Sequence, residues 1–155
     1  MRWLLNSKLI TLLFCGSLFA AGQINPPFIQ CPPVGADTSC AILIVVTDKA
    51  VNVYNDPSQG PFDTIEDTLI GVQNNSSGTL YSLPLSSPNP IFSFDNDGIC
   101  GTSPVTGQPY SPAPPACPYG PTTYEGPGVS FSSVSNDQTS GIVNFTNGLG
   151  PGQST

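Results

Sequence analysis

Proline is the residue type that most restricts how this chain can fold. All 18 prolines follow residue 22, and eight of them lie within residues 98–128. Proline lacks the backbone N–H that helices and central strands use, so neither element forms where prolines are this dense. Residues 98–128 are therefore predicted to form a long surface loop. Such a loop serves either as a recognition surface or as a solvated spacer.

The apolar residues outside this loop come in short runs, and no helical period lasts for more than one or two turns. Short runs bounded by turn-forming residues predict β-strands. Residues 41–46 (AILIVV) are apolar throughout and are expected at the centre of a sheet. The seven expected strands are 41–46, 51–54, 68–73, 79–85, 91–94, 129–134 and 141–146. Their number and spacing predict an all-β fold, an antiparallel immunoglobulin-like β-sandwich.

The N-terminal 22 residues have the pattern of a signal peptide. Arg2 and Lys8 precede an apolar run at 9–20, and small residues at its end fit cleavage before Gln23. A membrane span needs about 20 apolar residues, so this run is too short to be one. Cleavage would leave 23–155 as a single domain that is secreted, periplasmic or at the cell surface. An uncleaved membrane anchor is the alternative.

Export would place the four remaining cysteines in an oxidising compartment, where disulfides persist. Four cysteines allow three pairings, which the sequence cannot distinguish. We favour Cys31–Cys40 and Cys100–Cys117, because each pair brackets a stretch rich in proline and glycine, and the second would pin the long loop. Each bond would stabilise the fold by roughly 3 kcal/mol. A four-thiolate zinc site is the alternative, but the C-x-x-C spacing typical of such sites is absent.

The chain after the signal is strongly acidic. It contains ten acidic residues and one basic residue, Lys49, which gives a net charge of −9, and it contains no histidine. A surface with one cation cannot neutralise phosphates, so neither nucleic acid nor an anionic membrane is expected as a partner. Histidine-dependent catalysis and histidine-ligated metals are excluded.

Most of the acidic residues lie in short segments between the predicted strands. With a single cation in the domain, carboxylates that converge there would repel one another unless a metal ion is bound. Calcium would suit such a place, since it takes about six to eight oxygen ligands from loops. The candidate ligands are Asp56, Asp63, Glu66, Asp67, Asp95, Asp97 and Glu125. The alternative is a solvated acidic surface without a bound ion.

Paired carboxylates also hydrolyse glycosides. Acidic residues in turns more often serve solvation, however, and we expect no enzymatic activity. The leading hypothesis is a secreted, non-catalytic binding or structural module of the cell surface or matrix, with an unknown ligand. The alternative is a calcium-dependent carbohydrate-binding or glycoside-hydrolysing module.

Five segments between residues 31 and 154 carry a resemblance to other proteins. They are CPPVGADTSCAILIVVTD, YNDPSQGPFDTIEDTLIGVQNNSSGTL, FDNDGIC, CPYGPTTYEGPGVSFSSVS and GIVNFTNGLGPGQS. Together they resemble a group of uncharacterised exported bacterial proteins, many of which carry a PEP-CTERM sorting tail. The resemblance implies export and a β-sandwich, and it implies no established activity.

The last residues, 149–155, have the pattern of a turn that leads into a final strand. Members of the resembling group usually continue past this P-G-x-S turn into another strand, whereas this sequence ends there without a sorting tail. We therefore expect that the domain lacks its last strand or that another chain supplies it. An unpaired edge strand invites strand addition, so self-association is predicted.

Overall fold

The computed structural model describes residues 24–95, 97–100 and 119–155. The predicted signal peptide, Cys117 and most of the proline-rich loop lie outside these residues. The described chain is all-β, as predicted, with the strands β1 (Ile42–Val46), β2 (Val51–Asn55), β3 (Ile70–Asn74), β4 (Leu80–Ser86), β5 (Val129–Ser132) and β6 (Ser140–Leu149). Within these ranges, no helix is long and apolar enough to cross a membrane.

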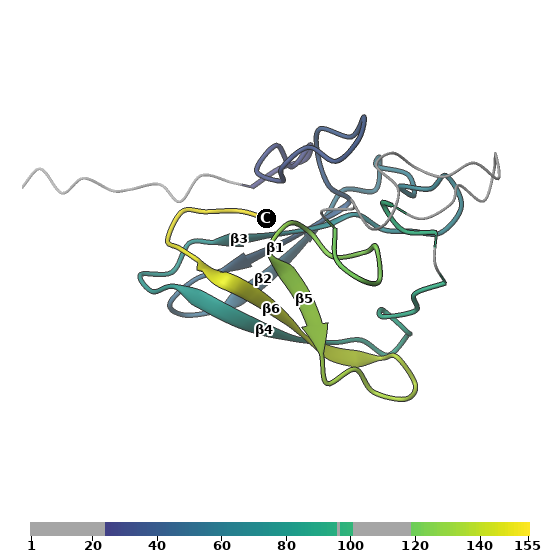
Figure 1. The fold of residues 1–155 in the computed structure, drawn as a ribbon. Helices are drawn as coiled ribbons and strands as arrows, with labels where there is room; N and C mark the ends of the chain where they lie inside the picture. The colour runs from purple at the N-terminus through teal and green to yellow at the C-terminus, as the bar shows by residue number, and fades with distance from the viewer. Residues whose placement is uncertain (1–23, 96, 101–118) are drawn as a thin grey trace, which may run out of the picture.

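The strands form two three-stranded sheets that pack face to face (Figure 1). In the first sheet, of order β2-β1-β3, β1 is antiparallel to β2 and parallel to β3. The second sheet, of order β4-β6-β5, is antiparallel throughout. The prediction of a purely antiparallel sandwich is therefore wrong for the β1–β3 pair. The connection after β2 stays at the end of the sheet where β1 begins, so β3 starts there and runs in the same direction as β1.

Six of the seven predicted strands form, and the seventh, at 91–94, does not. The N–H groups of Ile91 and Phe92 both donate to the carbonyl oxygen of Gln138, at 2.9 and 3.1 Å, instead of entering a ladder. Two prolines just before this segment cannot donate to a neighbouring strand. The Phe92 ring is buried and packs edge-on against Phe131, with 5.6 Å between the ring centroids. Phe92 therefore fills the core from an irregular segment, while Ile91 stays exposed.

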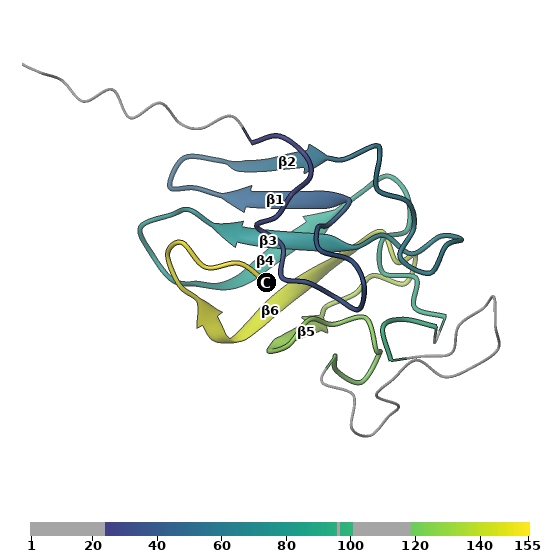
Figure 2. The ribbon, with the colours of Figure 1, turned by 90° about the horizontal axis from the view of Figure 1, so that it is seen from above.

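β1 is buried on both faces, as its unbroken apolar run predicts. Ile44 and Val46 face the second sheet and join the core between the two sheets. Leu43 and Val45 face the other way and pack against the N-terminal segment, which crosses the outer face of the first sheet (Figure 2). The prediction that 41–46 lies at the centre of a sheet is confirmed.

The predicted Cys31–Cys40 disulfide is present. Both cysteines are buried on the outer face of the first sheet, in a cluster with Leu43. Gly71 of β3 leaves room for the sulfur atoms, because a Cβ at this position would lie 2.3 Å from Cys31 Sγ. A disulfide fits an oxidising compartment outside the cytoplasm. Since Cys117 lies outside the described residues, the pairing of Cys100 with Cys117 stays a prediction.

The segment after β6 turns and then runs antiparallel beside β3. The N–H of Thr155 donates to the carbonyl oxygen of Val72 at 3.0 Å, and the N–H of Val72 donates to the carbonyl oxygen of Thr155 at 2.8 Å. The N–H of Asn74 donates to the carbonyl oxygen of Gln153 at 2.9 Å. The expected turn therefore forms, and the residues that follow it pair with the outer edge of β3.

Candidate cation site

Two segments at one end of the sandwich bring carboxylates together, the β2–β3 connection and the segment after β4, and the segment before β5 adds Tyr124 (Figures 1 and 2). Five of the seven predicted ligands fall into two overlapping groups whose oxygen atoms lie within 4.8 Å of one another. The inner group is Asp63, Asp67 and Asp97, and the outer group is Glu66, Asp95 and Asp97. Lys49, the one basic residue in the described ranges, lies in the β1–β2 turn at the opposite end.

Asp63 is the most buried carboxylate of the inner group, with 3% of its surface exposed. Its Oδ1 accepts hydrogen bonds from the N–H groups of Ile65, Glu66 and Asp67, at 2.9, 2.8 and 2.9 Å. Burial acts to raise the pKa of Asp63, but these bonds outweigh it, so the pKa is lowered and the carboxylate is ionised at neutral pH. Its Oδ2 is buried and has no hydrogen-bond partner among the described residues. A buried ionised oxygen of this kind requires a partner, and a cation would supply one.

Asp67 lies beside Asp63 in an unfavourable electrostatic environment. The pKa of Asp67 is raised to about 6, first by burial and then by the negative charges of four neighbours, Asp97, Asp63, Asp95 and Glu66. Its Oδ2 is also buried without a hydrogen-bond partner in the described part of the chain. The inner group therefore contains two buried oxygens that have no hydrogen-bond partner among the residues the structure describes.

Tyr124 joins the outer carboxylates. Its hydroxyl oxygen lies 2.5 Å from Asp95 Oδ1 and 2.6 Å from Asp97 Oδ1. One hydroxyl proton serves only one of these contacts, so the other requires a second proton or a cation. Hydrogen bonds with Asp97 and Tyr124 lower the pKa of Asp95, whereas the bond with Asp95 and burial raise the pKa of Asp97. We therefore expect the second proton to reside on Asp97.

Aromatic contacts fix Tyr124 in place. Its ring centroid lies 5.0 Å from that of Phe94, which stacks on Phe131 of β5 at 5.1 Å. Phe94 directly precedes Asp95, so the same contacts position an acidic residue of the outer group. Tyr124 is not among the predicted site residues. Its place beside Glu125 in the YEGPG motif is the one signal in the sequence that pointed to it.

Two predicted ligands, Asp56 and Glu125, belong to neither group. Asp56 Oδ1 accepts from the N–H and the hydroxyl of Ser58, at 2.9 and 2.6 Å, and so caps the turn after β2. Glu125 Oε2 accepts from the N–H and the hydroxyl of Thr122, at 3.1 and 2.7 Å. Each carboxylate organises its own turn, and their positions give no support to a role as calcium ligands.

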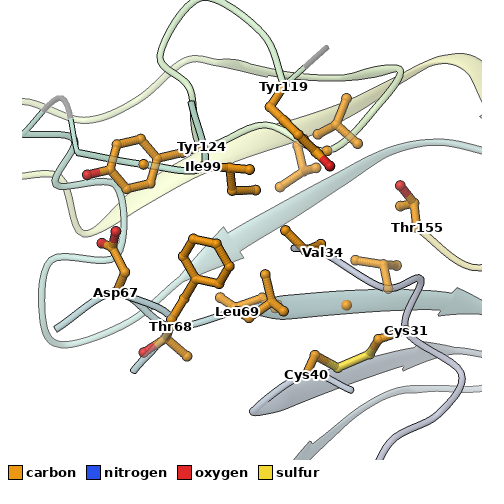
Figure 3. Close-up of a pocket in the computed structure, with 18 of the residues that line it drawn as sticks. Cys31, Val34, Cys40, Asp67, Thr68, Leu69, Ile99, Tyr119, Tyr124 and Thr155 are labelled. Atoms are coloured by element: carbon orange, nitrogen blue, oxygen red, sulfur yellow. A yellow bond between two sulfur atoms is a disulfide. The ribbon is translucent and has the colours of Figure 1, made fainter. Parts of the chain in front are cut away.

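A cavity of about 250 Å³ lies next to the carboxylates. Figure 3 shows Asp67 and Tyr124 at one end of it, and the disulfide and Thr155 at the other. Its walls are mainly apolar and include Phe92 and Val143 from the core. Apolar cavities of roughly 150 Å³ hold a benzene-sized molecule, so this one has room for a small apolar group. The cavity and the acidic site share Asp67 and Tyr124.

The raised pKa of Asp67 predicts that the protein, without divalent cations, becomes more stable as the pH falls from about 7 to about 5. A carboxyl group with a pKa of about 6 when folded, against 3.8 as its ordinary value, binds its proton more tightly in the folded state. Its charged form therefore destabilises the fold above about pH 6. Allowing for solvent screening, we expect the free energy of unfolding in a chelating buffer to rise by about 1 kcal/mol. This corresponds to a melting temperature higher by roughly 3–5 °C.

The Asp67→Asn variant, which does not titrate, serves as the control for this pH dependence. Its melting temperature should change much less over the same pH range. An equal rise in the variant would assign the effect to another group. At lower pH the stability should fall again, because Asp63, whose pKa is lowered, then becomes protonated and its ionised form no longer stabilises the fold.

Comparison with known proteins gives no match to a family model, to a curated protein or to a solved structure. The resemblance to exported bacterial proteins therefore stays a prediction, and the candidate site is argued from its geometry.

Proposed function

We propose that this protein is a secreted, non-catalytic β-sandwich module that binds a divalent cation, calcium above all, between Asp63, Asp67 and Asp97. The observation that carries the proposal is Asp63 Oδ2. The residue Asp63 is 3% exposed. Its Oδ1 accepts hydrogen bonds from three N–H groups, whereas its Oδ2 has no hydrogen-bond partner among the described residues. One carboxylate oxygen from each of Asp63, Asp67 and Asp97 lies within 4.8 Å of the other two.

The donor atoms favour calcium over other metals. All of them are carboxylate oxygens, which hard cations prefer, and no histidine exists in the chain. The three residues lie on irregular loops, which suit the flexible coordination of calcium better than the strict octahedron of magnesium. Sites of this kind in extracellular modules bind calcium with dissociation constants of about 0.1–1 mM.

A cation at this place would connect the two sheets. Asp63 and Asp67 lie on the connection that leads to β3 of the first sheet, and Asp97 lies on the segment that follows β4 of the second. The bound ion would also fix one end of the apolar cavity, which shares Asp67 with the site. This arrangement supports a binding role in which the ion orders the mouth of the cavity.

Asp95 and Asp97 both contact the Tyr124 hydroxyl, which leaves no room for a sugar between them and supports binding over glycoside hydrolysis. The apolar walls of the cavity suit an apolar group better than a sugar, whose hydroxyl groups need polar partners. Carbohydrate binding stays the second candidate. The disulfide supports export, and the two packed sheets support an immunoglobulin-like sandwich, although the parallel β1–β3 pair counts against that type.

Calcium titration of Asp63→Asn tests the proposed function. In the unchanged protein, about 10 mM calcium should raise the melting temperature by roughly 5–10 °C, as expected for a ligand well above its dissociation constant. Asparagine keeps the Oδ1 acceptor but replaces the Oδ2 charge by an N–H donor, so the variant should bind calcium at least about tenfold more weakly. Without calcium the variant should be less stable than the parent, because the ionised Asp63 carboxylate stabilises the fold through its three N–H bonds. The calcium response of each protein is therefore measured against its own melting temperature without calcium.

Asp48→Asn is the matched control. Asp48 lies in the β1–β2 turn, where its Oδ1 accepts from the N–H and hydroxyl of Ser77 at 2.8 and 2.9 Å. The substitution removes the same charge far from the site, so it should leave the calcium response unchanged. If both variants bound calcium equally more weakly than the parent, the effect would come from net charge alone. If the parent showed no response to calcium, the proposed function would be refuted.

A further inference from the structure

The first sheet ends in an edge strand, β2, that lacks the usual protection against pairing with another chain. Natural edge strands carry prolines, charges or bulges that prevent such pairing. β4, an edge strand of the second sheet, contains Pro84 and a bulge between Leu80 and Ser82. β3 is paired along its outer edge by the segment that ends at Thr155. β2 (VNVYN) has no proline, charge or register shift.

The register of the β1–β2 pair defines which backbone groups of β2 point outward. Two bonds fix the alternation: the N–H of Asp56 donates to Ala41 O at 2.8 Å, and the N–H of Thr47 donates to Ala50 O at 2.9 Å. In an antiparallel pair every second residue bonds to its partner strand. The intervening residues Val51, Val53 and Asn55 therefore direct their N–H and C=O groups away from β1. In the described part of the chain, no backbone bond to these groups occurs outside the strands.

The side chains of the same residues form an apolar surface. Val53 pairs with Ile44 and Val51 pairs with Val46, so both point to the face that carries the core between the sheets. They lie at the margin of that core, where they are 66% and 52% exposed. Figure 2 shows β2 at the margin of its layer. Outward backbone groups and exposed valines thus coincide on one strand.

We propose that two copies of this chain pair antiparallel through β2, around a twofold axis near Val53. This register places Val53 opposite the partner's Val53, and Val51 opposite the partner's Asn55. Every outward N–H and C=O group of the three alternating residues then finds its complement, because an isologous antiparallel pair is self-complementary. The valines of both copies meet on one face and extend the core across the interface.

The absence of charge on β2 fits this pairing. The strand has no charged side chain, so an antiparallel pair of two copies places no like charges directly opposite each other, although the protein as a whole is acidic. Asp48 and Lys49 precede the strand, and Asp56 follows it. The Asp56 carboxylate is buried and accepts from Ser58, so it adds no exposed charge at the end of the strand.

Sedimentation of the purified protein between about 1 µM and about 1 mM tests the pairing. We expect a concentration-dependent shift from monomer to dimer. Val53→Pro removes an outward N–H without touching the β1–β2 bonds, so it should raise the dimer dissociation constant about tenfold or more. The control is Tyr81→Thr. Tyr81 is 65% exposed and lies on the protected strand β4, so its substitution should leave the dimer dissociation constant unchanged.

A cysteine variant covers the case in which Val53→Pro does not fold. In the proposed register the Cα atoms of residue 53 in the two copies lie about 5.5 Å apart, a distance that permits a disulfide. Val53→Cys should therefore form a covalent dimer under mild oxidation, whereas Tyr81→Cys should not. A protein that stays monomeric at all concentrations, a dimer that Val53→Pro leaves unchanged, or equal crosslinking of both cysteine variants would overturn the proposal.

Discussion

Replacing Asn74 by alanine is expected to lower the free energy of unfolding by about 3 kcal/mol. Asn74 ends β3 and is completely buried. Its Nδ2 donates to the carbonyl oxygens of Gly78 and Leu149, at 2.8 and 2.7 Å, and its Oδ1 accepts from the N–H and hydroxyl of Ser76, at 3.0 and 2.6 Å. Since Leu149 ends β6, this side chain connects the two sheets. Alanine would leave buried acceptors and donors without partners.

Chemical denaturation of Asn74→Ala and Asn75→Ala measures this effect. Asn75 is the exposed neighbour in the same turn, and its substitution should change stability by less than about 0.5 kcal/mol. Asn74→Asp should be at least as damaging as alanine, because it keeps the Ser76 contacts but sets an oxygen against two carbonyl groups. A small effect at Asn74 would show that the bond to Leu149 does not hold the sheets together.

Gly71→Ala is expected to destabilise the protein by about 2–3 kcal/mol. Gly71 lies in β3 beneath the disulfide, where a Cβ would lie 2.3 Å from Cys31 Sγ and 3.0 Å from Cys40 Sγ. The sulfur atoms are held by their bond and by the buried cluster around Leu43, so they have little room to move. The added methyl group would force the N-terminal segment away from the sheet.

A double-mutant cycle isolates this contact. In a Cys31→Ala/Cys40→Ala background, itself less stable by about 3 kcal/mol, the further cost of Gly71→Ala should fall below about 1 kcal/mol. Gly60→Ala is the control, because a Cβ at Gly60 meets no atom within 4 Å. An equal cost in both backgrounds would mean that the strain at Gly71 does not come from the disulfide.

The sequence predicted the elements that depend on local pattern. The apolar run at 41–46 required burial on both faces, and β1 has it. Cys31 and Cys40 bracket a stretch rich in proline and glycine, which favoured their pairing, and the disulfide forms. The segment at 91–94 shows the limit of this reasoning, because an apolar run fills a core equally well as a wedge of aromatic rings.

The features that failed or were missed depend on contacts between distant residues. In the sequence Asn74 has the pattern of a turn-forming residue. Its hydrogen-bond partner Leu149 lies 75 residues away, so no local pattern indicates the contact. The seven candidate ligands include the five carboxylates that cluster, but the local bonds that occupy Asp56 and Glu125 could not be distinguished from ligand positions. The parallel β1–β3 pair follows from the path of a connection, which leaves no periodic signal.

Terbium luminescence tests the central claim, a cation between Asp63, Asp67 and Asp97, most directly. Terbium replaces calcium in oxygen sites and emits when a nearby aromatic ring absorbs. The one tryptophan, Trp3, lies in the predicted signal peptide, so tyrosine is the sensitiser of the mature chain, and Tyr124 contacts Asp97. We predict saturable emission that calcium displaces, that Tyr124→Phe largely abolishes and that Asp63→Asn shifts to at least about tenfold higher terbium concentration. Absent emission, or emission that neither substitution changes, would contradict the account.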